Sequence, residues 1–347
     1  MKFKPSTPRV VLSALLSALL LIACSDKPEV MLESAKAYLA KNDSKAAVIQ
    51  IKNALQTNPN LPEARFLLGQ ALLEGGDAVG AETELRKALE LKHPQDLVLP
   101  FLATALINQA QAKKLIDEFE KTELTLPAAQ ANFKTSLALA YGSLGKQELS
   151  RAAVDQALQA VPGFPAAQIV QVRHKAAQKE FDAALAQLEQ VNAAAPTNVD
   201  AWKLKGDLLL YAKKQFDPAL QAYHKALELK PDFLAGHAAA VTILLQQNKV
   251  DDATAQLAQL KKVAPAHPQT KYLESQLAFQ KKDFKAARDL IQEVLKVAPS
   301  NVQALQLAGA VEMQLNALVQ AEAYLSKALQ ALPDLALARS LLVLTYL

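Results

Sequence analysis

Cysteine, glycine and aromatic residues are scarce in this chain. Its 347 residues include one cysteine and 10 glycines, and 5% are aromatic, whereas 51% are apolar. A single cysteine excludes an internal disulfide, a Cys-x-x-Cys redox pair and a cysteine-rich zinc site. Few glycines and aromatics, with long stretches rich in Ala, Leu, Gln and Lys, argue against an all-β fold and indicate helices.

An excess of basic charge is also missing. The formal net charge is +4, and residues 1–23 hold three of the basic residues, Lys2, Lys4 and Arg9, and no acidic one. Removing these three charges from +4 leaves +1 for the rest of the chain. Proteins that bind nucleic acids normally carry a clear basic excess, so we expect no nucleic-acid partner.

Residue patterns typical of catalysis are absent from the sequence. The five histidines are dispersed, with no two within one helical turn, and there is no Gly-rich phosphate loop and no G-x-S-x-G motif. The adjacent acids Asp251 and Asp252 lie at a predicted helix start, where the helix dipole favours negative charge. We therefore predict a protein that is not an enzyme, needs no cofactor and binds no metal.

The N-terminus has the pattern of an export signal. A short basic segment precedes a mostly apolar run over 10–23, which is shorter than the roughly 20 residues of a membrane-spanning helix. The run ends Leu21-Ile22-Ala23-Cys24, which resembles a bacterial lipobox. The resemblance implies a lipoprotein signal peptide over 1–23 and a lipid on the Cys24 thiol. An ordinary cleaved signal and a short uncleaved anchor are the alternatives.

The residues after Cys24 bear on localisation. In lipoproteins, Ser directly after the lipidated cysteine is typical of sorting to the outer membrane, whereas Asp there retains the protein at the inner membrane. Here Ser25 follows Cys24, and Asp26 comes next. We expect a lipid-anchored protein that faces the periplasm, with the outer membrane favoured over the inner, and a short tether over 24–27.

A repeat of about 34 residues occupies the rest of the chain. Two series of residues show this period: a series of prolines, and a series of mostly small residues that runs from Ala47 to Ala321 in phase with it. The prolines recur every 33 to 35 residues, at Pro59, Pro94, Pro127, Pro162, Pro196, Pro231, Pro265, Pro299 and Pro333. A period of 34 residues is typical of tetratricopeptide (TPR) repeats, each a helix–turn–helix.

The repeats predict an all-α TPR-type helical solenoid after the signal peptide. Residues 28–335 would form nine repeats, of which 96–127 is degenerate, and 336–347 the first helix of an incomplete tenth. The best copy of the motif W-x2-L-G-x2-Y…A-x3-F…P has Trp202 at the first position. We expect a right-handed superhelix whose concave groove is lined by the first helix of each repeat.

Several positions have predicted structural roles. The small residues at the eighth and twentieth places, such as Gly206 and Ala219, would lie where the two helices cross. Aspartates in the turns would cap the second helices, as would Asp217 before Pro218. The turn aspartates are Asp43, Asp77 and Asp283.

The groove is the candidate functional site. A protein or peptide partner could lie along this surface, although the same residues could instead pack against neighbouring helices. No Lys and Asn clamp for a C-terminal carboxylate is recognisable, which argues against a co-chaperone. By TPR spacing, the groove residues are Phe66, Arg173, Asp207, Leu210, Tyr211, Tyr272, Phe279 and Met313.

The order of features resembles a specific family. A lipobox followed by Ala/Gln/Leu-rich TPR repeats, with the opening stretch from Leu32 to Asp77, is similar to the TPR-repeat lipoprotein of PEP-CTERM/exosortase systems (PrsT type). That resemblance implies a non-catalytic envelope scaffold linked to exopolysaccharide export. The alternatives are an outer-membrane or pilus assembly lipoprotein, and a TPR segment of a longer protein ending in a glycosyltransferase- or peptidase-type enzyme.

The C-terminal segment is strongly apolar. The stretch 336–347 has no second helix to cover it, and solenoids need a polar cap at each end. Buried Leu side chains contribute about 1.5–3 kcal/mol each, so uncovered ones are a liability. We expect this end either to self-associate or to fray.

Overall fold

The structure, a computed structural model, describes residues 27–41 and 43–346. These residues form nineteen α-helices and contain no β-strand. The predicted signal peptide and Cys24 lie outside the described residues. None of the described helices is both long and apolar enough to cross a bilayer.

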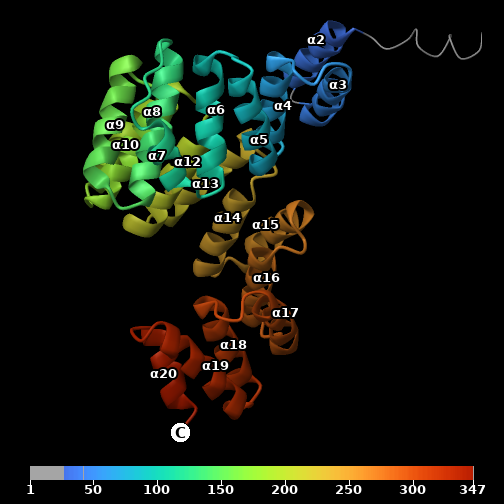
Figure 1. Ribbon diagram of the computed structural model, residues 1–347. Helices are drawn as coiled ribbons and strands as arrows, with labels where there is room; N and C mark the ends of the chain where they lie inside the picture. Colours follow the sequence, from blue (N-terminus) through green and yellow to red (C-terminus); the bar gives the residue numbers. More distant parts are fainter. Residues whose placement is uncertain (1–26, 42, 347) are drawn as a thin grey trace, which may run out of the picture. The chain divides into compact units, whose positions relative to one another are not determined.

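Successive helices form hairpins joined by short turns, and each hairpin corresponds to one repeat (Figure 1). Within a hairpin the helices pack together, as α4 does on α5 and α14 on α15. The helices are α2 (Pro28–Leu39), α3 (Ser44–Thr57), α4 (Pro62–Glu74), α5 (Ala78–Glu90), α6 (Gln95–Asn108), α7 (Ala112–Phe119), α8 (Pro127–Ser143), α9 (Gln147–Ala160), α10 (Pro165–Ala177), α11 (Phe181–Ala194), α12 (Val199–Asp207), α13 (Phe216–Leu229), α14 (Leu234–Gln246), α15 (Val250–Val263), α16 (Pro268–Gln280), α17 (Phe284–Val297), α18 (Val302–Gln314), α19 (Leu318–Ala331) and α20 (Ala336–Leu344).

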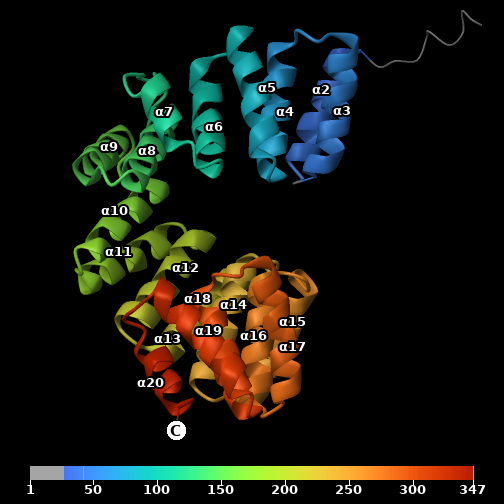
Figure 2. The ribbon, with the colours of Figure 1, turned by 60° about the horizontal axis from the view of Figure 1, so that its bottom comes forward.

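The helices form two compact units, with the boundary inside α10 after Gln171. In the N-terminal unit the first helices of successive hairpins, α2, α4, α6 and α8, contact one another in turn. In the C-terminal unit α14, α16, α18 and α20 do the same (Figure 2). First helices therefore form a continuous layer within a unit, which is the arrangement of a TPR solenoid.

Small residues allow the two helices of a hairpin to approach closely. A Cβ atom added to Gly69 would lie 2.5 Å from Cγ of Leu85, and one added to Gly309 would lie 2.5 Å from Cγ of Leu325. At Gly206 it would lie 2.8 Å from the ring of Tyr223. In these three repeats the contacts confirm the predicted role of the small residue at the eighth place, because a side chain on the glycine would overpack the crossing.

Three of the four predicted caps are confirmed. Asp43, Asp77 and Asp283 each accept a hydrogen bond from a backbone N–H three residues on, at 3.0, 2.8 and 3.1 Å. The prediction for Asp217 was wrong, because α13 begins at Phe216 and places Asp217 inside its first turn. Its carboxylate accepts a hydrogen bond from the side-chain amide of Gln247, at 2.9 Å, in the next hairpin.

A recurring clamp ties four of the linkers to the helices that follow them. Side-chain nitrogens of Arg65, Trp202 and Arg339 donate to the carbonyl of the proline six residues earlier, at 2.7 to 3.0 Å. The Nε2 atom of His237 lies 2.9 Å from the equivalent carbonyl, that of Pro231. In four repeats the position that the TPR motif gives to Trp is thus filled by a residue with a side-chain N–H group.

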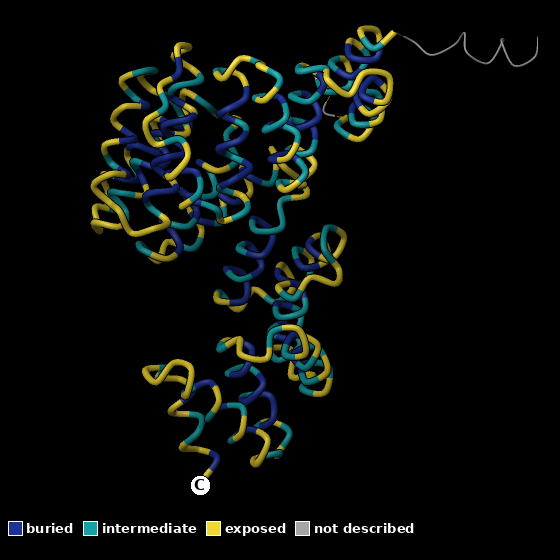
Figure 3. Tube along the Cα trace, in the orientation of Figure 1, coloured by how far each residue is buried: buried dark blue, intermediate teal, exposed yellow. Residues whose placement is uncertain are grey.

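The degenerate third repeat is firmly packed. Its second helix, α7, has only eight residues, yet Leu102, Leu106 and Leu115 are completely buried. Figure 3 shows buried residues along the helices here and exposed residues in the turns. Leu115, which replaces the usual small residue, is therefore a core residue of this repeat.

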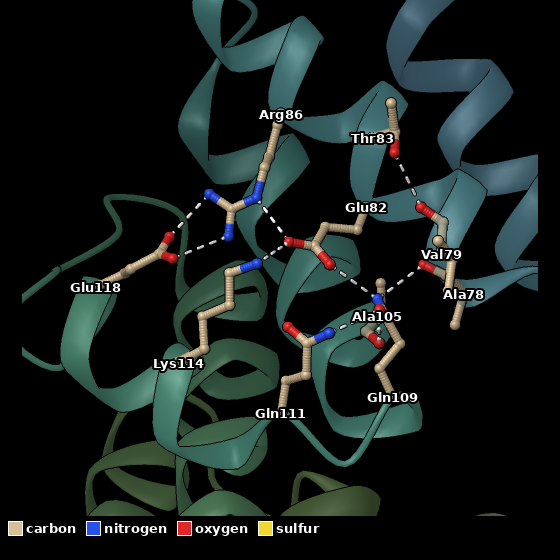
Figure 4. Close-up of polar contacts among 10 residues, drawn as sticks. All are labelled: Ala78, Val79, Glu82, Thr83, Arg86, Ala105, Gln109, Gln111, Lys114 and Glu118. Carbon is tan, nitrogen blue, oxygen red and sulfur yellow. Dashed lines mark hydrogen bonds and ion pairs between the residues drawn. The ribbon is translucent and has the colours of Figure 1, made fainter.

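A buried carboxylate joins this repeat to the one before it (Figure 4). Glu82 of α5 is 8% exposed and accepts hydrogen bonds from Arg86 at 2.8 Å, Lys114 at 2.6 Å and Gln109 at 3.0 Å. Arg86 also binds Glu118 of α7 through both terminal nitrogens, at 2.8 and 3.1 Å. Burial alone would raise the pKa of Glu82, but the hydrogen bonds from Lys114 and Arg86 outweigh it and lower the pKa to about 2.

The last described helix leaves apolar side chains uncovered. Leu337, Val343 and Leu344 of α20 and Tyr346 after it are each more than half exposed. Leu341 and Leu342 are partly buried.

Candidate functional site

A pocket of about 450 Å³ lies on the first helices of the C-terminal unit. We call it the Tyr211 pocket, after the exposed aromatic ring on its wall. Its floor is formed by the start of α14, one wall by α12, and the far end by the start of α16. The lining residues are Lys203, Asp207, Tyr211, Leu234, Ala235, Ala238, Ala239, Thr242, His267 and Gln269.

A second, smaller pocket of about 180 Å³ adjoins it, which we call the Phe279 pocket. Thr242 lines both pockets, so they form one continuous surface across α12, α14, α16 and α18. The ring of Phe279 packs edge-on against Phe284, with centroids 5.4 Å apart, which fixes its orientation. The lining residues are Thr242, Leu245, Gln246, Gln276, Phe279, Gln280 and Leu307.

A π-helical turn shapes the wall of the Tyr211 pocket. After Asp207, helix α12 continues as the π turn η1 (Leu208–Ala212). Within it, Tyr211 is 61% exposed, whereas Leu210 is 2% exposed and packs in the core with Tyr223 and Ile243. The prediction that Leu210 lines the groove was therefore wrong, because the turn directs it into the core.

The charges of the Tyr211 pocket are paired with each other. Asp207 accepts hydrogen bonds from the hydroxyl of Tyr223 at 2.7 Å and from the ammonium of Lys203 at 2.5 Å. Burial, and then the nearby Asp207 carboxylate, raise the pKa of Tyr211 and of Tyr223, so both phenols are neutral donors. The wall therefore presents a neutral hydrogen-bonded group rather than a free charge.

Comparison with known families agrees with this architecture. Tetratricopeptide repeat models match residues 32–95, 169–232 and 272–336, which together are more than half of the chain, and a further one matches 210–277. The chain belongs to the tetratricopeptide repeat family. No curated protein matches it in sequence.

Solved TPR structures resemble the chain in fold. PilF of Pseudomonas aeruginosa has a TM-score of 0.54 and 17% identity, over 62% of this chain and 97% of that one. PilW, described as a widely conserved type IV pilus biogenesis factor, has a TM-score of 0.54 and 17% identity, over 61% and 98%. Cut9 in the APC/C hetero-tetramer Cut9–Hcn1 has a TM-score of 0.50 and 12% identity, over 96% and 92%.

The remaining predicted residues lie elsewhere on the TPR helices. Phe66, in the N-terminal unit, stacks on His93 with centroids 4.9 Å apart and meets Phe101 edge-on, so it packs between two hairpins. Tyr272 is partly buried between two apolar clusters, and burial raises its pKa. Arg173 is exposed on α10 and Met313 is partly buried on α18, and neither lines the two pockets.

Some of the lining residues were not predicted. Ala235, Ala238 and Ala239 of α14 line the Tyr211 pocket, and Gln246 and Gln276 line the Phe279 pocket with Phe279 itself. Alanine and glutamine are common in every repeat of this chain, so neither residue type marks the site. The sequence did hold one signal for the Tyr211 pocket. A run of small residues in one first helix, α14, follows a repeat whose first helix, α12, ends near a Tyr.

The described residues offer no metal site, since they contain no group of three or more His, Cys, Asp or Glu suited to hold an ion. Their buried acids have structural partners, as Glu312 has in the Nε atom of Arg288 at 3.0 Å. The TPR fold typically serves as a scaffold for protein–protein interactions.

Proposed function

We propose that this protein is a non-catalytic adaptor of the bacterial envelope, lipid-anchored at Cys24, whose C-terminal unit binds a protein partner needed for exopolysaccharide export or a PEP-CTERM/exosortase system. The observation that carries the binding role is the continuous surface of the Tyr211 and Phe279 pockets. The envelope role is supported by the lipobox resemblance and by the order of lipobox and repeats.

The two pockets suit recognition of a polypeptide. They lie on the layer of first helices, where rigid helices hold the rings of Tyr211 and Phe279 in fixed positions. An exposed Tyr and a partly buried Phe beside small residues are typical of interface anchors, since they bury large areas at little entropic cost. A partner chain running across α12, α14 and α16 could fill both pockets at once.

The anchor would hold the repeats near the membrane. From Cys24 to the start of α2 at Pro28, an extended chain reaches at most roughly 17 Å. Two or more acyl chains anchor a protein stably, whereas one chain does not. The adaptor would therefore present its binding surface close to the lipid headgroups.

Complementation of a gene deletion tests this proposal. In the source bacterium, we expect deletion to reduce exopolysaccharide release, and the wild-type gene to restore it. Cys24→Ala should release the protein from membranes, and Tyr211→Ala with Phe279→Ala should leave it anchored but inactive. Full restoration by both variants, or no effect of the deletion, would contradict the proposal.

A second candidate function is assembly of type IV pili. Its support is the likeness in fold to PilW and PilF, which covers nearly the whole of those chains. The same deletion strain distinguishes the two. Loss of surface pili with normal exopolysaccharide would favour the pilus role, and the reverse would favour the export role.

A further inference from the structure

The surface formed by the Tyr211 and Phe279 pockets offers almost no free charge. Lys203 and Asp207 neutralise each other, and the lining residues of the Phe279 pocket include no ionisable side chain. Besides Tyr211, the remaining ionisable residue of the Tyr211 pocket is His267, which caps α16 by accepting a hydrogen bond from the backbone N–H of Gln269 at 3.1 Å. A charged group that entered would lose its hydration without gaining an opposite charge. Electrostatics therefore favour an uncharged ligand.

Side-chain amides surround the apolar parts of this surface. Gln246, Gln276 and Gln280 line the Phe279 pocket, and Gln269 lines the Tyr211 pocket. Gln276 donates to the hydroxyl of Tyr272 at 3.1 Å and Gln280 to the carbonyl of Leu245 at 2.9 Å, so these two amides offer their Oε1 atoms as acceptors. A carboxamide both donates and accepts hydrogen bonds. An extended polypeptide has free N–H and C=O groups that must be satisfied when buried, whereas an α-helix satisfies its own. The amides are thus suited to an extended chain.

The pockets differ in size and wall. The Tyr211 pocket, of about 450 Å³, has an alanine floor beside an aromatic ring, and the Phe279 pocket is about 180 Å³. The first would accept an aromatic or other large apolar side chain and the second a smaller one. The midpoints of their linings on α14 are about six residues apart, or roughly 9 Å at 1.5 Å per residue. At about 3.3 Å per residue, an extended chain covers this in three or more positions.

We infer that this surface selects an uncharged, extended segment of its partner, with a large apolar side chain in the Tyr211 pocket and a smaller one, three or more positions away, in the Phe279 pocket. The inference rests on the proposed function, because it names the partner chemistry that the same surface takes. A surface of this kind differs from one that binds acidic C-terminal tails or amphipathic helices.

Selection from a random library tests the inference. The probe is a phage-displayed library of random dodecapeptides, panned on the full chain purified in detergent. We expect enriched peptides to lack charge and to share two apolar positions at one spacing. Fluorescein-labelled synthetic copies then give Kd by anisotropy, and circular dichroism shows whether the bound peptide is extended.

Variants connect binding to the two pockets. Ala239→Leu fills the Tyr211 pocket and Tyr211→Ala removes its wall, so each should weaken the Kd at least about tenfold, as loss of an anchor does. Tyr211 is exposed, so its removal should leave the fold intact if Ala239→Leu disturbs it. Val319→Ala, on an exposed apolar residue of α19 that lines neither pocket, is the matched control.

Several results would overturn the inference. These are charged consensus sequences, peptides that become helical on binding, a library without enriched sequences, or affinities that Tyr211→Ala and Ala239→Leu leave unchanged. Failure of the proposed function is read separately, by complementation. If Tyr211→Ala fails to restore export but the selected peptides are charged or helical, the adaptor role would stand and the inferred partner chemistry would be wrong.

Discussion

The third and sixth repeats depart from the common pattern in opposite ways. The third, α6 and α7, is the weakest match to the TPR motif, yet it buries Leu102 and Leu115 fully and is joined to the preceding repeat through Glu82. The sixth, α12 and α13, is the best match, yet it contains a π turn and leaves Tyr211 exposed beside a pocket. Agreement with the motif thus predicts neither how regularly a repeat packs nor where the candidate surface lies.

The largest effect should separate the two repeats by stability. Leu115→Ala removes a fully buried side chain from the third repeat and should destabilise the protein by about 3 kcal/mol. Tyr211→Ala in the sixth should change stability by less than about 0.5 kcal/mol, because its side chain is mostly in water. Urea unfolding followed by circular dichroism measures both. Equal losses would show that Tyr211 belongs to the core.

Glu82 should give the next largest effect, with a distinctive pH dependence. Glu82→Gln keeps the shape but removes the charge that Arg86 and Lys114 share, and should cost about 2 kcal/mol at pH 7. Folding lowers the pKa of Glu82 from 4.5 to about 2. Its contribution is therefore complete above pH 4.5 and is lost as the pH falls toward 2.

The pH dependence can be measured as the difference in unfolding free energy between wild type and Glu82→Gln at several pH values. That difference should shrink as the pH falls below 4.5. A difference that is constant down to pH 2 would mean that the carboxylate is not held by its ion pairs.

An intermediate effect is expected at the crossing in the sixth repeat. Gly206→Ala would place a methyl group 2.8 Å from the ring of Tyr223, which must move and strain its hydrogen bond to Asp207. We expect a loss of about 1–2 kcal/mol, with weaker binding at the Tyr211 pocket. Hydrogen exchange of the backbone amides in α12 and α13 measures the loss of stability. If neither the hydrogen exchange nor the affinity of the Tyr211 pocket changes, the ring of Tyr223 moves aside without cost.

The smallest effects should come from turn carboxylates with different roles. Asp43→Ala removes a helix cap and should cost about 1 kcal/mol. Asp217→Ala removes only exposed contacts to Gln247 and Lys249, and should cost less than about 0.5 kcal/mol. Thermal unfolding of the two variants compares them directly. A larger loss at Asp217 would imply that it ties two hairpins together.

The sequence was sufficient for the fold because each repeat carries its own signals. Periodic prolines, small residues at the crossings and aspartates in the turns are all local. The cap at Asp217 and the groove position of Leu210 could not be obtained in this way. Both errors lie in the sixth repeat. There Ala184 and Ala219 are 35 residues apart, whereas Ala219 and Ala253 are 34 apart. The longer spacing indicates one extra residue but does not reveal that the π turn is where it lies.

The candidate site was predicted in part for a related reason. Asp207, Tyr211 and Phe279 were identified from spacing along first helices, and the structure gathers them on one surface. Phe66 fits the same spacing but packs against His93. Whether an aromatic residue at such a position lines a pocket depends on the neighbouring first helix, and alanines leave room for one on α14.

The linker clamp changes how the signature tryptophan of this motif should be understood. Arg65, Trp202, His237 and Arg339 differ in shape, charge and hydrophobicity, and what they share is a nitrogen that reaches a carbonyl one turn before the helix. In these four repeats the position supplies a hydrogen-bond donor on a long arm, and the aromatic ring is one solution among several. Other repeats have Pro100, Phe133 and Leu305 at the same place and do not use a side-chain donor there. A repeat that lacks the tryptophan can therefore still tie its linker to the helix, as the repeats with Arg65, His237 and Arg339 do.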